Sequence, residues 1–108
     1  MKLISHLTDA KHCIQSGTLF RDQYGTLRSK IFKNESLENT VIDGVPPEIS
    51  HEIFYSDKDA YVVYTYSHPI AVFSLKNGHT TLEVIHINNF ENKHSRKHVK
   101  MLEKWFEN

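Results

Sequence analysis

Histidine is the residue type in this chain with the clearest capacity for chemistry. The 108 residues include eight histidines, and His94 and His98 stand four positions apart near the C-terminus. On a helix, that spacing places two imidazoles on one face, where both could ligate one metal ion. The H-E-x-x-H pattern of zinc proteases is absent, and Glu91 is the nearest acidic residue. A metal-dependent nuclease is therefore only our third functional hypothesis, and we expect no bound metal or cofactor.

The single cysteine, Cys13, is predicted to pack in the core. A nucleophilic thiol needs a nearby base, and the adjacent His12 would point away from it on a helix. The sequence contains no G-x-S-x-G motif, no phosphate-binding P-loop and no G-x-G-x-x-G motif. We therefore expect a protein without enzymatic activity.

Cysteine usage and hydropathy predict the setting of the protein. A single cysteine cannot form an intrachain disulfide, which favours a reducing compartment. The first residues lack the apolar run of a signal peptide, and no window approaches the roughly 20 apolar residues of a membrane span. We expect a cytoplasmic protein with no membrane partner.

Charge is unevenly distributed although the formal net charge is zero. Residues 1–33 and the C-terminal tail are mildly basic, whereas residues 34–60 are acidic. We expect the acidic residues of the middle segment to contact a partner, where they could locally occupy a nucleic-acid-binding groove by charge mimicry. Zero net charge speaks against mimicry by the whole protein, and the alternative role of these acids is solubility and protection of a sheet edge. These residues are Glu48, Glu52, Asp57 and Asp59.

The last predicted helix begins with a cluster of basic residues: Arg96, Lys97 and Lys100. A helix N-terminus binds phosphate through its free amides, and these cations would strengthen such a contact. The alternative to phosphate binding is that these basic residues form a solvated helix face or contact a protein. Zero net charge speaks against a global electrostatic footprint for nucleic acid.

Tyrosines mark a second candidate contact surface. Tyr61, Tyr64 and Tyr66 lie on one predicted strand, and we expect them to be exposed. Tyrosine is enriched at protein interfaces, and on a sheet it can also stack on nucleic-acid bases. The three tyrosines therefore fit a binding protein of either kind.

The residues from Tyr61 to Ile87 predict the elements that position these side chains. Apolar and β-branched residues form strands over Ala60–Tyr66, Pro69–Leu75 and Thr80–Ile87. The turn signal Asn77-Gly78 pairs the last two strands and places Leu75 and Lys76 opposite the start of the third. On the first strand Tyr61, Val63 and Thr65 share one face, and neither face is cleanly polar. We expect helices to cover one face and a partner the other.

The flanking segments complete the predicted architecture. Apolar spacing predicts helices over Ser5–Gly17, with Ser5 or Thr8 as N-cap, and over Arg96–Phe106, with Ser95 as N-cap. Residues 18–32 predict a strand or hairpin, 33–50 a loop, and 51–56 a short strand. The whole chain, 1–108, is predicted to be a single α+β domain. In it, a small antiparallel sheet (a β-meander) packs with an N-terminal and a C-terminal helix.

Three stretches of the C-terminal half form a recognisable pattern: Tyr64-Thr-Tyr-Ser-His-Pro-Ile-Ala71, Asn77-Gly78 and Asn92-Lys-His-Ser-Arg-Lys-His98. On these stretches, the C-terminal half resembles a family of small uncharacterised bacteriophage proteins. The family pattern is a strand ending in Ser-Tyr-x-Thr-Pro-Ile-Ala, a hairpin, and a Thr-Thr-Ser-Arg-His stretch opening a final helix. Here Ser67-His68 replaces x-Thr, and only His98 keeps its place in the second motif. The resemblance implies a phage or mobile-element origin, and therefore the cytoplasm of a host cell as the setting. It brings no catalytic residue.

These observations lead to one functional expectation and two alternatives. We expect a non-catalytic phage protein that binds and inhibits a bacterial host or defence protein, for example a CRISPR effector or a restriction system. The first alternative is a small nucleic-acid-binding regulator using the basic C-terminal helix, and the second is the nuclease built on His94 and His98. An open edge strand would also allow a homodimer.

Overall fold

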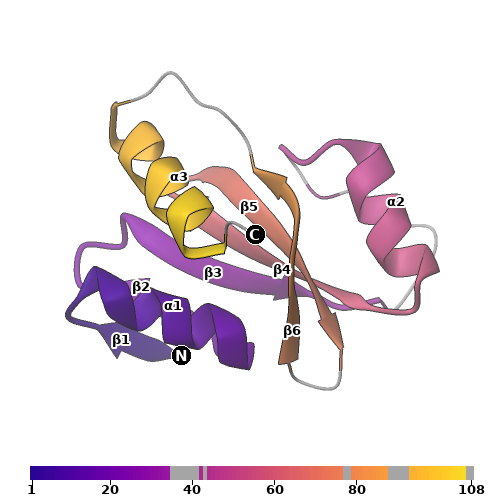
Figure 1. The fold of residues 1–108 in the computed structure, drawn as a ribbon, viewed down its shortest axis with the longest axis horizontal. Coiled ribbons are helices and arrows are strands. Elements are labelled where there is room, and N and C mark those ends of the chain that lie inside the picture. Colours follow the sequence, from indigo (N-terminus) through magenta and orange to yellow (C-terminus); the bar gives the residue numbers. More distant parts are fainter. Residues whose placement is uncertain (35–41, 43, 77–78, 88–92, 107–108) are drawn as a thin grey trace.

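The computed structural model of the chain describes residues 1–34, 42, 44–76, 79–87 and 93–106. The described strands form one six-stranded sheet in the order β1-β2-β3-β4-β5-β6. The elements along the chain are β1 (Lys2–Ile4), α1 (Leu7–Ser16), β2 (Phe20–Asp22), β3 (Leu27–Phe32), α2 (Pro47–Tyr55), β4 (Asp59–Thr65), β5 (His68–Lys76), β6 (His79–Ile87) and α3 (Lys93–Phe106) (Figure 1). The predicted α+β class, with helices near both ends of the chain, is confirmed.

The sheet is mixed because its first connection differs from the others. β1 and β2 are parallel and joined through α1, whereas each later neighbour pair is antiparallel. Parallel strands require a crossover, which α1 supplies. The predicted meander is β4-β5-β6, with Leu75 opposite Thr80 and Lys76 opposite His79, as the turn signal indicated. The Asn77-Gly78 turn itself lies outside the described residues.

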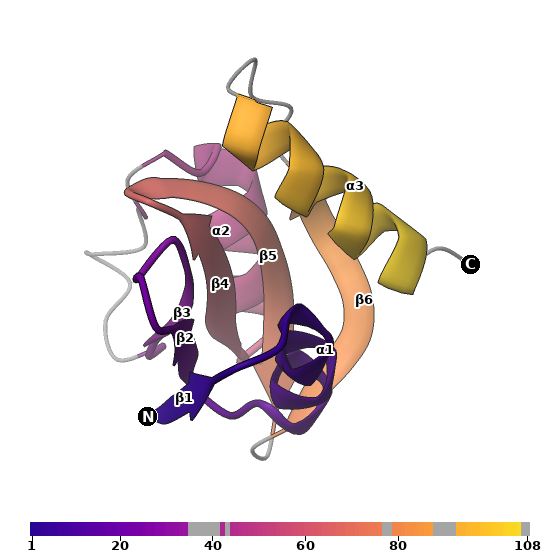
Figure 2. The ribbon, with the colours of Figure 1, turned by 90° about the vertical axis from the view of Figure 1, so that its left-hand side faces the viewer.

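Two apolar cores lie on opposite faces of the sheet. The inner core joins α1 and α3 to one face, through side chains such as Ile14, Leu102 and Phe73. The outer core joins α2 to the other face, through side chains such as Ile53 and Val62. Figure 2 shows the sheet curving around α1 and α3, with α2 on its outer side. Helices therefore cover part of both faces of β4, and the expectation that a partner covers its second face was wrong.

The helix α2 was missed by the sequence analysis, which predicted a loop to residue 50 and then a strand. Pro47 is the first residue of α2, where its fixed φ suits a helix. Its missing N–H costs nothing there, because the first N–H groups of a helix have no acceptor within the helix. Ile53 and Phe54 turn inward onto β4, so burial of one helical face stabilises the segment. The residues 51–56 contain an apolar–polar alternation too short to distinguish a strand from this helix.

The boundaries of the other two helices differ slightly from prediction. α1 ends as expected, with Gly17 at φ 70° in the left-handed region, but its N-cap is His6 instead of Ser5 or Thr8. α3 begins at Lys93, earlier than predicted, so Ser95 lies inside the helix. The predicted strand or hairpin over residues 18–32 is confirmed as β2 and β3.

Gly44 supports a close approach between the segment before α2 and the start of β5. Its φ is 83°, and a Cβ at this position would lie 2.8 Å from Cγ of Pro69 and 2.9 Å from Cδ. Gly44→Ala is expected to lower the free energy of unfolding by about 1–2 kcal/mol through backbone strain alone, with the clash adding to it.

Gly25→Ala provides the matched control for this prediction. Gly25 has a φ of 70°, but nothing lies within 4 Å of the added Cβ. Urea denaturation of both variants separates backbone strain from the clash. Equal losses in the two variants would contradict the close approach of Gly44 to Pro69.

Candidate functional site: the outer face of α2

The outer face of α2 presents an aromatic pair flanked by acids. Glu48, His51, Glu52 and Tyr55 are spaced by three, four and seven residues, so they form one stripe along the helix. Tyr55 is 71% exposed, and its ring meets the His51 ring edge-on at a centroid distance of 5.8 Å. Glu48 and Glu52 are exposed on either side of His51. We call these four residues the α2 stripe.

Sequence reasoning found the two acids of the α2 stripe but missed its two rings. Glu48 and Glu52 were predicted to contact a partner, and the structure places both on one surface. The sequence analysis assigned His51, Glu52 and Tyr55 to a strand, with Glu52 on the face opposite the two rings, and Glu48 to the preceding loop. Recognising Pro46-Pro47 as the start of a helix would have revealed the common face.

Asp57 lies just beyond the C-terminus of α2 in a strained conformation. Its φ is 62°, the left-handed region usually occupied by glycine. Its N–H donates to the carbonyl of Phe54, and the N–H of Lys58 donates to that of Ile53. This is the hydrogen-bond pattern of a Schellman motif. A carboxylate here also faces the negative end of the helix dipole, so neither conformation nor charge favours Asp57 on stability grounds.

Asp57→Gly is therefore expected to raise the free energy of unfolding by about 1 kcal/mol. Asp57→Asn is the control, because it removes the charge and keeps a side chain that tolerates the left-handed region. Chemical denaturation of both variants checks the prediction. A loss of stability in Asp57→Gly would mean that the carboxylate makes a stabilising contact.

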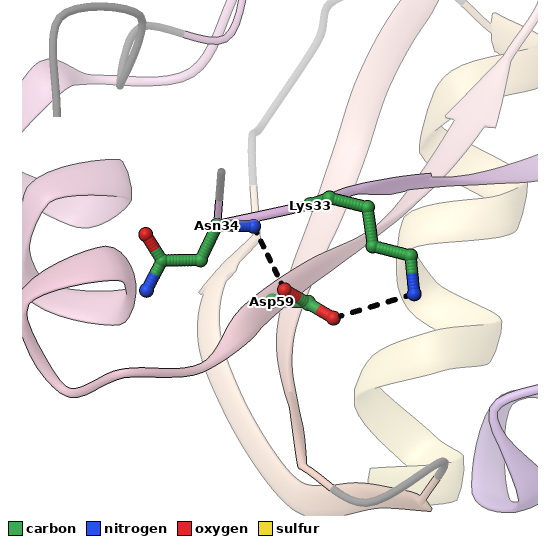
Figure 3. Close-up of polar contacts among 3 residues, drawn as sticks. All are labelled: Lys33, Asn34 and Asp59. Atoms are coloured by element: carbon green, nitrogen blue, oxygen red, sulfur yellow. Dashed lines mark hydrogen bonds and ion pairs between the residues drawn. The ribbon is translucent and has the colours of Figure 1, made fainter. Parts of the chain in front are cut away.

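Asp59 was predicted to contact a partner, but its carboxylate is used within the chain (Figure 3). One oxygen accepts a hydrogen bond from the backbone N–H of Asn34 at 2.8 Å, and the other lies 3.6 Å from Nζ of Lys33. The Asn34 side chain in turn donates to the carbonyl of Phe54 at 2.8 Å. Asp59 thus ties the end of β3 to the start of β4, close to the end of α2.

Two of the three predicted surface tyrosines are buried, so that expectation was wrong for them. Tyr61 has no exposed surface and Tyr64 is 7% exposed. The reason is that β4 lies between β3 and β5 and is covered on both faces. Tyr66, 44% exposed, is the only one of the three at the surface. It follows β4 with φ 56°, and its N–H donates to the carbonyl of Thr26 at 2.9 Å.

The basic residues of α3 form a separate surface. Arg96, Lys97 and Lys100 are all exposed, on a helix that covers the inner face of the sheet, whereas α2 lies on the outer face. The predicted contact residues therefore do not converge on one site. The exposed ones divide among α2 with the turn just after it, α3, and the turn after β4 that holds Tyr66. Figure 2 shows α2 and α3 on different sides of the sheet.

Of the three side chains considered for chemistry, His98 and Cys13 are directed inward. His98 is 7% exposed, and its Nδ1 lies 2.9 Å from Oγ1 of Thr65. The side chain of His94 lies outside the described residues. Cys13 is 3% exposed within the inner core, as predicted, and burial raises the pKa of its thiol, which makes it unreactive.

Within the described residues, no three or more His, Cys, Asp or Glu side chains gather to hold a metal ion. None of the described helices combines the length and apolarity needed to cross a membrane. No protein-family model, curated protein or solved structure matches the chain. The α2 stripe remains the surface at which an exposed aromatic residue and several predicted contact residues coincide.

Proposed function

We propose that this chain is a non-catalytic, phage-encoded protein that docks on a bacterial host or defence protein through the α2 stripe and inhibits it. The observation that carries the proposal is the exposed Tyr55, held against His51 and flanked by Glu48 and Glu52. Tyrosine is enriched among the residues that dominate protein–protein binding energy. The phage origin rests on the resemblance of the C-terminal half.

The charge of the α2 stripe indicates the chemistry of the partner. Two carboxylates one helical turn apart, with Asp57 just beyond the helix, favour a cationic partner surface. In host defence systems, such surfaces include the nucleic-acid grooves of CRISPR effectors and restriction enzymes. By occupying such a groove, the α2 stripe would exclude the substrate nucleic acid and inhibit the enzyme.

The first test is capture from bacterial lysate by the tagged protein, after nuclease treatment, compared with Tyr55→Ala. The unsubstituted protein is expected to retain a specific host protein. Tyr55→Ala is expected to weaken that binding by about thirtyfold, corresponding to a hot-spot loss of about 2 kcal/mol. Equal capture by both proteins, or capture that disappears with nuclease, would contradict the proposal.

Charge variants test the electrostatic part of the proposal on the captured partner. Glu48→Gln with Glu52→Gln is expected to slow association and flatten its salt dependence. Lys97→Gln with Lys100→Gln, on the far side of the sheet, is the control. It should leave the association rate and its salt dependence unchanged. Inhibition is measured as loss of the partner's nuclease activity on its own substrate.

The basic face of α3 supports the alternative of a nucleic-acid-binding regulator. Arg96, Lys97 and Lys100 are exposed there, available to phosphate groups. In that case Lys97→Glu with Lys100→Glu would abolish binding to duplex DNA, while Tyr55→Ala would not affect it.

A further inference from the structure

A row of cations lies on the outer face of β2 and β3, beside the area covered by α2. Register places Leu3 next to Arg21, and Arg21 opposite Arg28. Arg28 is in turn opposite Tyr64, which packs in the outer core, so the whole row lies on that face. Lys30, two residues beyond Arg28, points to the same side. We call Leu3, Arg21, Arg28 and Lys30 the strand surface.

The strand surface is open to solvent, and none of the residues that the structure describes neutralises its charge. Arg21 and Lys30 are exposed, Arg28 is half-buried, and Leu3 is 57% exposed. Neither arginine nor Lys30 forms an ion pair with any residue that the structure describes. Three cations therefore stand together on this part of the sheet.

The pairing of Arg21 with Arg28 indicates an anion. Like charges directly opposite on neighbouring antiparallel strands destabilise a sheet. An anion between the two guanidinium groups would remove this repulsion and accept hydrogen bonds from both. Phosphate suits this position because arginine presents planar, paired donors to its oxygens.

Aromatic rings beneath two of the cations hold them in place. The guanidinium carbon of Arg28 lies 4.6 Å from the centre of the Tyr64 ring, and Nζ of Lys30 lies 5.3 Å from that of Phe32. Such contacts restrict long side chains before any ligand binds, which lowers the entropy lost on binding. Arg28 and Lys30 lie about 6.8 Å apart along the strand, so they would meet successive anionic groups of an extended chain.

Exposed tyrosines adjoin the row at the end of the sheet that carries the β2–β3 and β4–β5 turns. Tyr24, between β2 and β3, is 80% exposed, and Tyr66, after β4, is 44% exposed. The backbone bond from Tyr66 to Thr26 holds these two turns side by side. Nucleic-acid bases stack on such rings. An acidic peptide would instead anchor in an apolar pocket. The row itself offers only Leu3, and the hollow that Tyr24 helps to line, with Ile4 and Leu7, lies at the junction of β1 and α1.

We propose that the strand surface binds single-stranded nucleic acid, with phosphates at Arg21, Arg28 and Lys30 and bases on Tyr24 and Tyr66. This site lies apart from the α2 stripe and from the basic face of α3. It does not depend on the function proposed for either surface.

The test is fluorescence anisotropy with a labelled oligothymidylate of about twelve nucleotides. Binding is expected to weaken with salt, with a slope of log K against log salt of about −2 for three phosphate contacts. Arg21→Gln with Lys30→Gln should weaken binding at least about tenfold at low salt and reduce the slope to about −0.7. Lys97→Gln with Lys100→Gln removes the same charge from α3 and should change binding less than about twofold.

The possible outcomes are distinct. Loss in the strand variant and retention in the α3 variant support the proposal. A flat salt slope, equal loss in both variants, or binding of polyglutamate in preference to the oligonucleotide would overturn it. If thermal melting shows that the strand variant is destabilised, Tyr24→Ala decides instead, because its exposed ring can be removed without disturbing the sheet. Unchanged binding in Tyr24→Ala would then overturn the proposal.

Discussion

Tyr61→Ala is expected to lower the free energy of unfolding by about 3–5 kcal/mol, a large share of the stability of a domain this size. The Tyr61 side chain is fully buried, and its ring meets that of Phe73 edge-on at a centroid distance of 6.4 Å. Its hydroxyl donates to the carbonyl of Thr18 at 2.6 Å, joining β4 to the segment after α1. Removing the ring leaves a cavity and a carbonyl without that donor. Urea denaturation followed by circular dichroism measures the loss.

Two controls make the Tyr61 result specific. Tyr61→Phe keeps the ring and loses only the hydroxyl, so about 0.5–1.5 kcal/mol is expected. Tyr55→Ala removes a ring of the same kind from the surface and should change stability by no more than about 0.5 kcal/mol. A Tyr61→Ala protein as stable as Tyr55→Ala would contradict the burial of β4.

The second large effect is expected at alkaline pH. Burial raises the pKa of Tyr61 well above its ordinary value of about 10, with a smaller opposing effect from a hydrogen bond to Ser29. The unfolded chain therefore loses this proton at a lower pH than the folded chain. Above about pH 10 the unfolded state binds fewer protons, so the contribution of Tyr61 to stability falls by about 1.4 kcal/mol per pH unit.

Comparison with Tyr61→Phe isolates this contribution from other titrating groups. The free energy of unfolding of both proteins is measured by denaturant titration between neutral pH and strongly alkaline pH. The difference in free energy of unfolding between the two proteins should be constant below about pH 9. Above that pH, the unsubstituted protein should lose stability steadily relative to Tyr61→Phe. Parallel curves throughout the range would show that the Tyr61 hydroxyl titrates equally in both states.

The fold was predictable wherever local signals agreed with tertiary packing. The β-meander follows from β-branched runs and one turn signal, and the end of α1 follows from Gly17. The helix α2 was missed because its nine residues contain few turns of apolar pattern, and its stability depends on burial against β4. The strand β1 has only three residues, which are too few for periodicity to reveal.

The candidate sites were less predictable because they depend on register and coverage. That Arg21 and Arg28 oppose each other follows from strand pairing, which composition does not determine. The sequence predicted that Tyr61 and Tyr64 lie on opposite faces of their strand. Their burial follows from the central position of β4, which the sequence does not reveal. The acids Glu48 and Glu52 were identified by charge alone, and the helix that aligns them with Tyr55 was not.

The position of α1 also has a consequence for how the chain is synthesised. α1 lies beside β6, so this helix contacts a strand that is made only after β2 to β5 (Figure 2). A nascent chain lacking β6 and α3 would leave the apolar side of α1, including Cys13, accessible to water. Thiol reagents should therefore modify ribosome-bound chains stalled before β6 at Cys13 and spare the folded protein. The synthesis of β6 and α3 would then be the step that closes the fold, and chains terminated before β6 would be prone to aggregation.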